Sequence, residues 1–485
     1  MNSRKIYPAR YRYVALGCWK AASALHLGGE SEAFEHATDM ALLRDSSGEF
    51  YIPAASIAGA GRNYLARELL TVADYERGRG AEPPAMLDLF GGGSPARNNP
   101  ARQYASLLST FDAPRSDGPN LETRDGVRID PRYGVAADQA KYDFEVLPRD
   151  TSFQFRMDLV EYAQPLRASA GDVLQHFAGL LCAFQEGRIR LGARTRRGLG
   201  QGRLVNLKVY RLDLAQKGGL LAWLRQTPEA GEDVTVAVLG QPPLATGGRL
   251  TFRIEAKLDL RTSLLIRSAT GDPADPDVMH LCENGAPLLS GSSLAGPLRH
   301  RVERIAKTLG IADAERLVKR MFGGAPESWK PRGNQPRDPE EIATASRVHV
   351  SEQQLTTGQY HVQSRVRIDR FTGGARDAAL FEEAPLWPNG PGHAAEISIV
   401  LEDPQPREQG LLLLALKDLW LGDLTLGGEA AAGRGVFEGR WARISGLPGM
   451  PSCEVYAAEG ANIRIEPPTA EAALNAAVQS IAGAR

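Results

Sequence analysis

The sequence predicts an α+β protein built from two tandem copies of one domain. Three observations support this prediction: the same short motifs return at a nearly constant separation, period-two strand patterns occur at matching places in both halves, and helical apolar patterns follow them. A chain of 485 residues is also too long for one ordinary hydrophobic core, because domains are typically ~150 residues long.

The repeat is visible in three pairs of segments. YIPAASIAGAGR, Tyr51 to Arg62, matches LLSGSSLAGPLR, Leu288 to Arg299, with an offset of 237. VRIDP from Val127 matches VRIDR from Val366, and LGARTRRGLG from Leu191 matches LGGEAAAGRG from Leu426. The last two offsets are 239 and 235. Three matches in one order indicate a duplication.

The predicted elements also follow one order in both halves. The segment RLTFRIEAKLDL, Arg249 to Leu260, puts Leu250, Phe252, Ile254, Ala256, Leu258 and Leu260 on one face of a strand. Its counterpart is Tyr11 to Leu27, and later strands at Phe153 to Leu159 and Ile397 to Leu401 precede helices at Val173 to Gln185 and Leu411 to Trp420. Strand, helix, strands, helix, strand is the order of a ferredoxin-like (RRM-like) domain.

The boundaries follow from the repeat and from a proline- and glycine-rich stretch. GQPPLATGG, Gly240 to Gly248, has the composition of a linker. We therefore expect a first domain at 1–215, a connecting segment at 216–248, a second domain at 249–447 and a C-terminal extension at 448–485, which ends in a helix.

Composition excludes several classes of protein. Hydrophobic residues make up 43% and charged residues 24%, as in globular proteins, and the longest apolar run is too short for a membrane span. The four cysteines form no CxxC pair, which fits a reducing compartment, and we expect a cytoplasmic protein. Because the net charge is only -1, any nucleic-acid binding must come from local basic clusters.

The repeated helix starts are the first candidate site. Ser56 in the first copy, and Ser292 or Ser293 in the second, are candidate N-caps, and an arginine follows within two turns, Arg62 or Arg299. A helix N-terminus presents unpaired N–H groups and a partial positive charge, so these residues would favour a phosphate. Each serine could instead simply cap its helix.

Two glycine-rich loops are the second candidate site. Glycine lets backbone N–H groups approach an anion closely. The first loop adds Arg194, Arg196 and Arg197 to Gly198 and Gly200, whereas the second has Glu429 and three alanines beside Gly433 and Gly435. The second loop should therefore bind phosphate more weakly, or serve packing.

Together these motifs resemble the RAMP superfamily of CRISPR systems. A serine-rich helix start with a following arginine, an RxxIDR-like segment and a late glycine-rich loop are its signature, and RVRIDRFTGGARDAALF from Arg365 is particularly similar to backbone subunits of type III effector complexes. The tandem arrangement resembles a III-D variant. The resemblance implies two RAMP domains that bind guide RNA and the guide–target duplex beside other type III effector subunits.

The family also projects a β-hairpin, called a thumb, from each domain. Such hairpins would lie near Arg124 to Glu145 and Arg365 to Phe381. Arginines that seek phosphates and an aromatic ring that stacks on a base suit this task. The expected RNA contacts are Arg128, Arg132 and Tyr133 in the first hairpin, and Arg365, Arg367, Arg370 and Phe371 in the second.

The resemblance further implies metal-dependent cleavage of target RNA by a loop aspartate after the first strand. The matching residues are Asp39 and Asp277, which lie 17 and 16 residues before Ser56 and Ser293. A carboxylate there would hold Mg²⁺ or Mn²⁺. Neighbouring acids remain alternatives, as does general acid–base chemistry by nearby histidines: Glu35, Asp45, Asp272 and Asp275; His26, His36 and His280.

Two rival functions stay open. One is a non-catalytic backbone in which the loop aspartates are turn residues. The other is a metal-independent, guide-processing ribonuclease of the same superfamily, which would commonly use histidine. The two hairpin segments and the matched aspartates favour a backbone subunit that also cuts its target.

Overall fold

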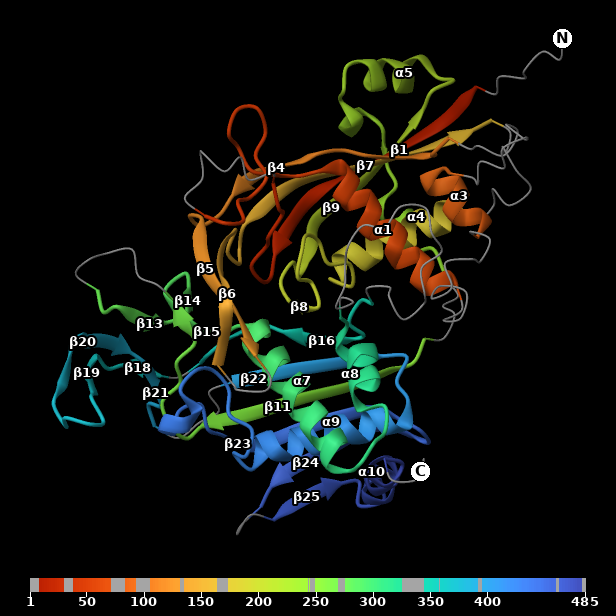
Figure 1. The fold of residues 1–485 in the computed structure, drawn as a ribbon. Coiled ribbons are helices and arrows are strands. Elements are labelled where there is room, and N and C mark those ends of the chain that lie inside the picture. Colours follow the sequence, from red (N-terminus) through yellow and green to blue (C-terminus); the bar gives the residue numbers. More distant parts are fainter. Residues whose placement is uncertain are drawn as a thin grey trace, which may run out of the picture. The chain divides into compact units, whose positions relative to one another are not determined.

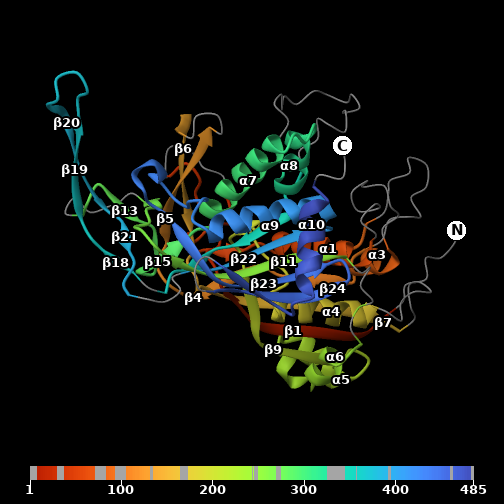
Figure 2. The ribbon, with the colours of Figure 1, turned by 90° about the horizontal axis from the view of Figure 1, so that it is seen from below.

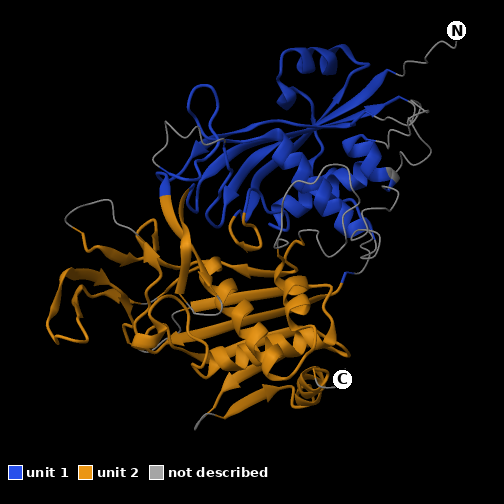
Figure 3. Cartoon of the chain, viewed as in Figure 1, with its two compact units in different colours: residues 1–122, 145–193, 200–249 blue, residues 123–144, 194–199, 250–485 orange. Residues whose placement is uncertain are grey.

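The computed structural model describes residues 8–29, 38–70, 83–92, 105–130, 135–163, 173–242, 244, 249–268, 275–324, 344–356, 358–390, 395–458 and 462–481. The chain divides into two compact units (Figure 3). Unit 1 comprises residues 1–122, 145–193 and 200–249, and unit 2 comprises 123–144, 194–199 and 250–485. Two segments of the first repeat therefore belong to the unit that is built mainly from the second repeat.

Unit 1 is a helix-backed sheet. Its strands lie in the order β10-β9-β1-β7-β4-β2, with β3 also paired to β7 (Figure 1). The elements are β1 (Ala9–Ala21), β2 (Tyr51–Ile52), α1 (Ala54–Leu69), α3 (Pro84–Phe90), β3 (Leu108–Thr110), β4 (Ala113–Asp117), β7 (Ser152–Tyr162), α4 (Val173–Gln185), β9 (Gly202–Asp213), α5 (Lys217–Leu224), β10 (Glu232–Asp233) and α6 (Thr235–Leu239).

Unit 2 repeats this plan. Its large sheet has the order β25-β24-β23-β11-β22-β16-β8. The elements of this sheet and its helices are β8 (Arg197–Gly198), β11 (Thr251–Leu260), α7 (Gly291–Thr308), α8 (Ala314–Phe322), β16 (Val348–Ser351), β22 (Ala395–Glu402), α9 (Pro406–Trp420), β23 (Phe437–Leu447), β24 (Met450–Ala457), β25 (Ile463–Glu466) and α10 (Ala470–Gln479).

Smaller strands complete unit 2 beside the large sheet. The first hairpin consists of β5 (Glu122–Asp130) and β6 (Val135–Val146), and the second of β19 (Gln363–Ile368) and β20 (Ala375–Ala384). Figure 2 shows β19 and β20 as a long arm that extends away from the sheet of this unit. The remaining strands are β12 (Arg267–Ser268), β13 (Val278–His280), β14 (Cys282–Glu283), β15 (Ala286–Leu289), β17 (Gln353–Gln354), β18 (Gln359–Tyr360) and β21 (Leu386–Trp387).

The strand order confirms the ferredoxin-like fold. In unit 1 β1 lies between β9 and β7, and in unit 2 β11 lies between β23 and β22. Helices α1 and α4 in unit 1, and α7 and α9 in unit 2, come after the first and second of these long strands in the chain. The predicted helix at Val173–Gln185 and both predicted hairpins are present. These elements form where predicted because their apolar periodicity is local.

Alternating burial explains why β11 is central in unit 2. Phe252, Ile254, Ala256 and Leu258 are buried on one face, as period two requires. The prediction was wrong for Leu250, which is 70% exposed because the strand begins only at the next residue. The buried strand face packs against α7 and α9 in one continuous hydrophobic core.

The C-terminal extension completes unit 2. Strands β24 and β25 continue the sheet beyond β23, and α10 packs on α9. A Cβ atom on Gly410 of α9 would come 2.3 Å from the carbonyl oxygen of Ala477 in α10, so glycine permits this close helix contact. The extension covers a sheet edge that would otherwise be open to pairing with other chains. No helix among the described residues is long and apolar enough to cross a membrane.

Candidate nucleic-acid interface

The start of α7 has a neutral cap. Ser290, and neither Ser292 nor Ser293, is the N-cap: its Oγ accepts from the Ser293 amide at 3.3 Å and donates to the Ser293 hydroxyl at 2.9 Å. The prediction placed the cap two or three residues late because any of the serines could accept this bond. No acidic residue lies in the first turn, so the positive end of the helix dipole is not neutralised there.

The start of α1 differs from that of α7. Its N-cap is Pro53 and not Ser56, which lies in the first turn, so the sequence-based cap was wrong here too. The Ala54 amide donates to Oδ1 of Asp112 at 2.7 Å. A carboxylate therefore already occupies this helix start. Arg62, the half-buried arginine two turns later, also has a polar partner.

The first glycine-rich loop lies against the start of α7 within unit 2. Its strand β8 pairs in parallel with β16. A Cβ atom at Gly291, the first residue of α7, would come 1.8 Å from the carbonyl oxygen of Arg197, and one at Gly198 would come 2.4 Å from the Glu352 amide nitrogen. Both glycines are therefore required for this close approach.

The other glycines of the two loops shape the backbone. Their amides already donate to carbonyl oxygens: Gly200 to Ala24 at 2.7 Å, Gly433 to Ala430 at 2.9 Å and Gly435 to Ser263 at 2.7 Å. All three have positive φ angles, which glycine adopts without strain. These amides are committed to the protein, so the charge that could attract a phosphate lies in the arginine side chains.

Arg197 and Arg299 bring two positive charges to the start of α7. Burial, helped by the nearby Arg197 guanidinium, lowers the pKa of Arg299, and Glu303 opposes this effect. Neither arginine has a hydrogen-bonded or ion-paired side chain in the part of the chain that the structure describes. Two like charges beside a helix N-terminus, one of them half-buried, form a site that an anion would stabilise.

The other two arginines of the loop are held by unit 2. The Arg194 guanidinium lies 3.9 Å from the ring centroid of Phe144 and donates to the Tyr142 hydroxyl at 3.1 Å. Arg196 forms an ion pair with Glu402 at 3.1 Å and contacts His349. The charge of Arg196 is therefore compensated, which leaves Arg197 as the better phosphate ligand of the three.

The tip of the second hairpin is open to solvent. Phe371 is 90% exposed, and Arg367 and Arg370 are also exposed. Asp369 shapes the turn, because its Oδ1 accepts from the amides of Phe371 and Thr372 at 2.9 Å each, and these bonds lower its pKa. In the first hairpin Arg128 is exposed, while Arg132 and Tyr133 lie outside the described residues.

Arg365 lies instead in a charge network at the root of the second hairpin. It pairs with Glu383 at 2.9 Å and with Glu429 at 2.5 Å. The buried Arg434 donates to Glu429 at 2.9 Å and also contacts Glu383. Arg365 therefore joins the hairpin to the second glycine-rich loop. The pairing was not evident from sequence, because Glu383 and Glu429 lie 18 and 64 residues away along the chain.

The root of the first hairpin holds a buried ion pair of its own. Arg124 on β5 is 3% exposed, and its Nη2 donates to Glu283 at 3.1 Å and its Nη1 to Glu352 at 2.8 Å. Both glutamates are buried. These charge-assisted bonds anchor the hairpin in unit 2.

The two loop aspartates lie at matching places beside the hairpin roots. Oδ2 of the exposed Asp277 accepts from the Glu382 amide of β20 at 2.8 Å. Next to the exposed Asp39, the Met40 carbonyl accepts from the Glu145 amide of β6 at 3.0 Å. Each aspartate thus follows the first strand of its repeat. Asp277 itself contacts the base of its hairpin, whereas in the first repeat the residue after Asp39 does so.

The structure distinguishes among the acidic residues that were alternatives to Asp39 and Asp277. Oδ1 of Asp45 alone accepts from both the Ser47 and the Glu49 amides, at 2.8 and 2.9 Å. This is the geometry of a turn residue. Asp275 is exposed, and Glu35 and Asp272 lie outside the described residues.

The histidines near these loops are packed in the protein. Nδ1 of the buried His26 donates to the Glu145 carbonyl at 2.7 Å. Nδ1 of the buried His280 accepts from the Ile266 amide at 3.1 Å, and burial lowers the pKa of His280 to about 4. His280 is therefore neutral at pH 7. His36 lies outside the described residues.

The side chains that could act as metal ligands limit how a metal ion could bind. Among the described residues no three His, Cys, Asp or Glu side chains form a cluster that could hold a metal. Asp277 uses only Oδ2 in its bond to Glu382. A hydrated Mg²⁺ or Mn²⁺ shared between one carboxylate and the phosphates of a substrate fits these residues, because Mg²⁺ commonly keeps several waters.

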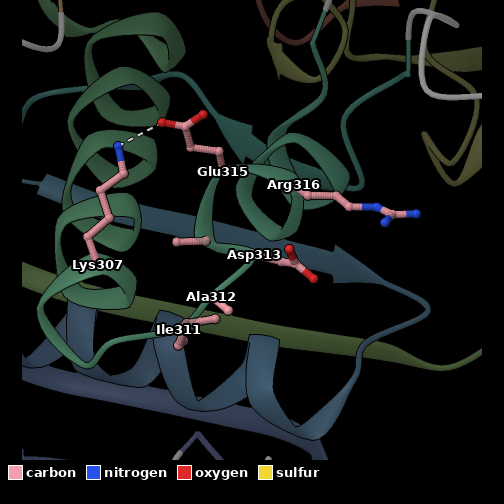
Figure 4. A pocket seen from close by; sticks show the side chains of 7 residues that line it. Lys307, Ile311, Ala312, Asp313, Glu315 and Arg316 are labelled. Atoms are coloured by element: carbon pink, nitrogen blue, oxygen red, sulfur yellow. Dashed lines mark hydrogen bonds and ion pairs between the residues drawn. The ribbon is translucent and has the colours of Figure 1, made fainter. Parts of the chain in front are cut away.

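A hollow of about 360 Å³ lies at the other end of α7 (Figure 4). It is lined by Lys307 and by residues of the turn into α8, among them Asp313 and Glu315. Lys307 Nζ lies 2.7 Å from Glu303 and 3.0 Å from Glu315, so its charge is compensated. This hollow contains none of the predicted site residues.

Comparison with known proteins agrees with the repeat and with the fold. A profile of the RAMP superfamily matches the chain twice, over residues 20–203 and 257–438, which together are well over half of its length. That superfamily is associated with RNA binding and with type III CRISPR complexes. No curated protein matched the chain. The chain is a member of the RAMP superfamily, with two tandem RAMP regions.

Proposed function

We propose that this protein is a backbone subunit of a type III CRISPR effector complex, and that it binds guide RNA and the guide–target duplex. The observation that carries the proposal is the pair Arg197 and Arg299 beside the neutral cap of α7. The phosphates of the guide RNA would lie over the start of α7. The exposed arginines and Phe371 of the second hairpin would then meet the duplex.

We further propose that Asp39 and Asp277 support two cuts of the target RNA. In such a cut a 2′-hydroxyl attacks the adjacent phosphorus, the bond to the 5′-oxygen breaks, and a cyclic phosphate and a 5′-hydroxyl result. A bound Mg²⁺ or Mn²⁺ would stabilise the charge that develops on the phosphate. The chain itself would position its carboxylates at the hairpin roots, where the duplex is expected to be opened.

One observation favours a second candidate, the non-catalytic backbone. Asp277 accepts a hydrogen bond from the Glu382 amide, which is also what a purely structural loop residue would do. The metal-independent ribonuclease has less support. His26 and His280 are buried and bonded to backbone groups, and the neutral His280 is poorly placed for proton transfer with RNA.

The binding proposal is tested with Arg197→Gln and Arg299→Gln combined in the full chain. We expect guide RNA to bind about a hundredfold more weakly, because each of the two lost hydrogen bonds to a charged group contributes roughly 1.5 kcal/mol. The slope of log K against log salt should fall by about 1.4 for two lost single-strand contacts. Fluorescence anisotropy of a labelled guide over a salt series measures both quantities.

Arg464→Gln is the matched control, since this exposed arginine lies on β25 in the C-terminal extension. It should leave the affinity and the slope unchanged. If the double variant is folded by circular dichroism and binds with the wild-type slope, the start of α7 is not on the RNA path.

A further inference from the structure

The guanidinium of Arg434 joins several parts of unit 2. Its Nε donates to Glu429 in the second glycine-rich loop at 2.9 Å, and its Nη1 donates to the Ser263 hydroxyl, just after β11, at 3.1 Å. Its Nη2 donates to Gln363 on β19 at 3.0 Å and also contacts Glu383 on β20. This side chain therefore ties the loop and the end of the first strand to both strands of the hairpin.

The centre of this network is buried. Arg434 is 4% exposed and Glu383 is 1% exposed. Among the described residues, Arg267, Arg365 and Arg434 share the carboxylates of Glu383 and Glu429. Charge-assisted hydrogen bonds are stronger than neutral ones, and a buried polar network that is satisfied holds its members in one arrangement. The network therefore fixes the position of the hairpin root.

Asp277 is anchored directly beside this network. Strand β13, which begins one residue after Asp277, pairs in parallel with β20 and places Val278 opposite Glu383. Oδ2 of Asp277 accepts from the Glu382 amide at 2.8 Å. The amide that donates to Asp277 thus belongs to the residue just before the carboxylate that Arg434 holds. Any shift of β20 at this point moves the hydrogen-bond donor of Asp277.

The first repeat holds its aspartate loop by different means. Leu199, a buried residue, stands where the second repeat has Arg434, at the offset of 235 that joins the two glycine-rich loops. In unit 1 the buried Glu145 at the end of β6 performs the anchoring, because its Oε2 accepts from the Leu42 amide at 2.9 Å. Loss of Arg434 should therefore disturb the aspartate of the second repeat and spare that of the first.

We propose that Arg434 is a positioning residue for Asp277: through Glu383 it holds the Glu382 amide, and this amide orients the Asp277 carboxylate. The inference rests on the proposed cleavage function and deepens it, because it assigns to that site a residue that acts only through other residues. Arg434 is too deeply buried to offer a surface to RNA. Its contribution is to the geometry of the cut and not to the affinity for RNA.

Hydrogen exchange of the full chain, without RNA or metal, tests the positioning itself. Arg434→Met should make the Glu382 amide exchange about tenfold faster, because β20 is no longer held at its root. Arg434→Lys keeps the charge and should restore part of the protection. Asp277→Ala should also speed the exchange, since it removes the acceptor. Arg440→Met is the matched control, because this exposed arginine of β23 pairs with Asp259, and it should leave the exchange unchanged.

Single-turnover cleavage in the assembled complex tests the consequence. At saturating guide and target, Arg434→Met should slow the cut that depends on Asp277 about a hundredfold, as a small displacement of a reacting group can do. Target binding and the cut that depends on Asp39 should keep their wild-type values. Arg434→Met added to Asp277→Ala should slow the cut no further than Asp277→Ala alone, because both changes act through one carboxylate.

The outcomes separate this inference from the proposed function. If Asp277→Ala leaves the cut intact, the proposed cleavage is wrong, and the exchange of the Glu382 amide still decides whether Arg434 positions Asp277. Wild-type protection of that amide in folded Arg434→Met, or a wild-type rate where Asp277→Ala does not cut, would overturn the inference. Should Arg434→Met not fold, Glu429→Gln is a milder change in the same network and should produce both effects in smaller size; wild-type behaviour of Glu429→Gln in both measurements would then overturn the inference.

Discussion

The starts of α1 and α7 have the same sequence motif but opposite electrostatic settings. At α7 a serine hydroxyl caps the helix and two arginines lie close by; at α1 the cap is Pro53 and a carboxylate from Asp112 holds the first amide. The comparison teaches that a repeated motif need not be a repeated site. Residues outside the motif decide whether the helix dipole is available to a phosphate.

The strongest test of this comparison is cleavage, because there the two repeats should be equivalent. In an assembled complex, Asp277→Ala should abolish one cut and Asp39→Ala the other, each by roughly a thousandfold, about 4 kcal/mol of transition-state stabilisation. Binding of the target should persist, since sequence is read by base pairing with the guide. Mapping the cut positions on sequencing gels measures both effects.

Asp275→Ala is the matched control and should keep both cuts. EDTA should abolish both cuts in the wild type while the uncut RNA stays bound. An identical pattern of cuts for the wild type and both single variants would make Asp39 and Asp277 turn residues and support the non-catalytic backbone.

The next effect concerns the hairpin roots, where the repeats differ. Arg124→Met leaves two buried carboxylates, Glu283 and Glu352, without their cation, and breaking a buried ion pair in this way costs about 3 kcal/mol. Denaturant unfolding should show a lower free energy of unfolding, and hydrogen exchange should become faster across residues 123–144. Arg128→Met, an exposed arginine on the same strand, should change stability by less than about 0.5 kcal/mol. Equal effects of the two changes would mean that the buried pairs do not anchor the hairpin.

The smallest effect is expected at the start of α1. Asp112→Asn removes the charge that competes with phosphate, so guide RNA should bind about twofold to fivefold more tightly, in line with roughly 0.3–1 kcal/mol for a charge at a helix end. Asp117→Asn is the control, because Asp117 ends β4, the strand that begins one residue after Asp112. Anisotropy measurements at low salt resolve such a difference, and a decrease in affinity would show that the Asp112 carboxylate shapes the site more than it repels RNA.

The local sequence pattern was enough to predict the tandem ferredoxin-like fold, but not which arginines are buried or ion-paired within the protein. Periodicity located the helix at Val173–Gln185 and the strand beginning near Phe252. The burial of Arg124 and the ion pair of Arg196 were not predicted, since their partners lie 159 to 228 residues away. On sequence alone the glycines at 198 and 200 could form an anion cradle; in the structure a Cβ atom at Gly198 would come 2.4 Å from the Glu352 amide nitrogen, and the Gly200 amide donates to the Ala24 carbonyl.

The anchoring of the first hairpin also sets an order on folding. Arg124 and Glu352 are separated by 228 residues, so during synthesis the hairpin waits for its second carboxylate for roughly 10–45 s at ordinary translation rates of about 5–20 residues per second. The side chains of Val127, Ile129 and Val135 in this hairpin are exposed in the folded chain as well, so the wait concerns the Arg124 anchor and not these side chains. The chain completes the anchor of its first hairpin only after about half of its second repeat has been made.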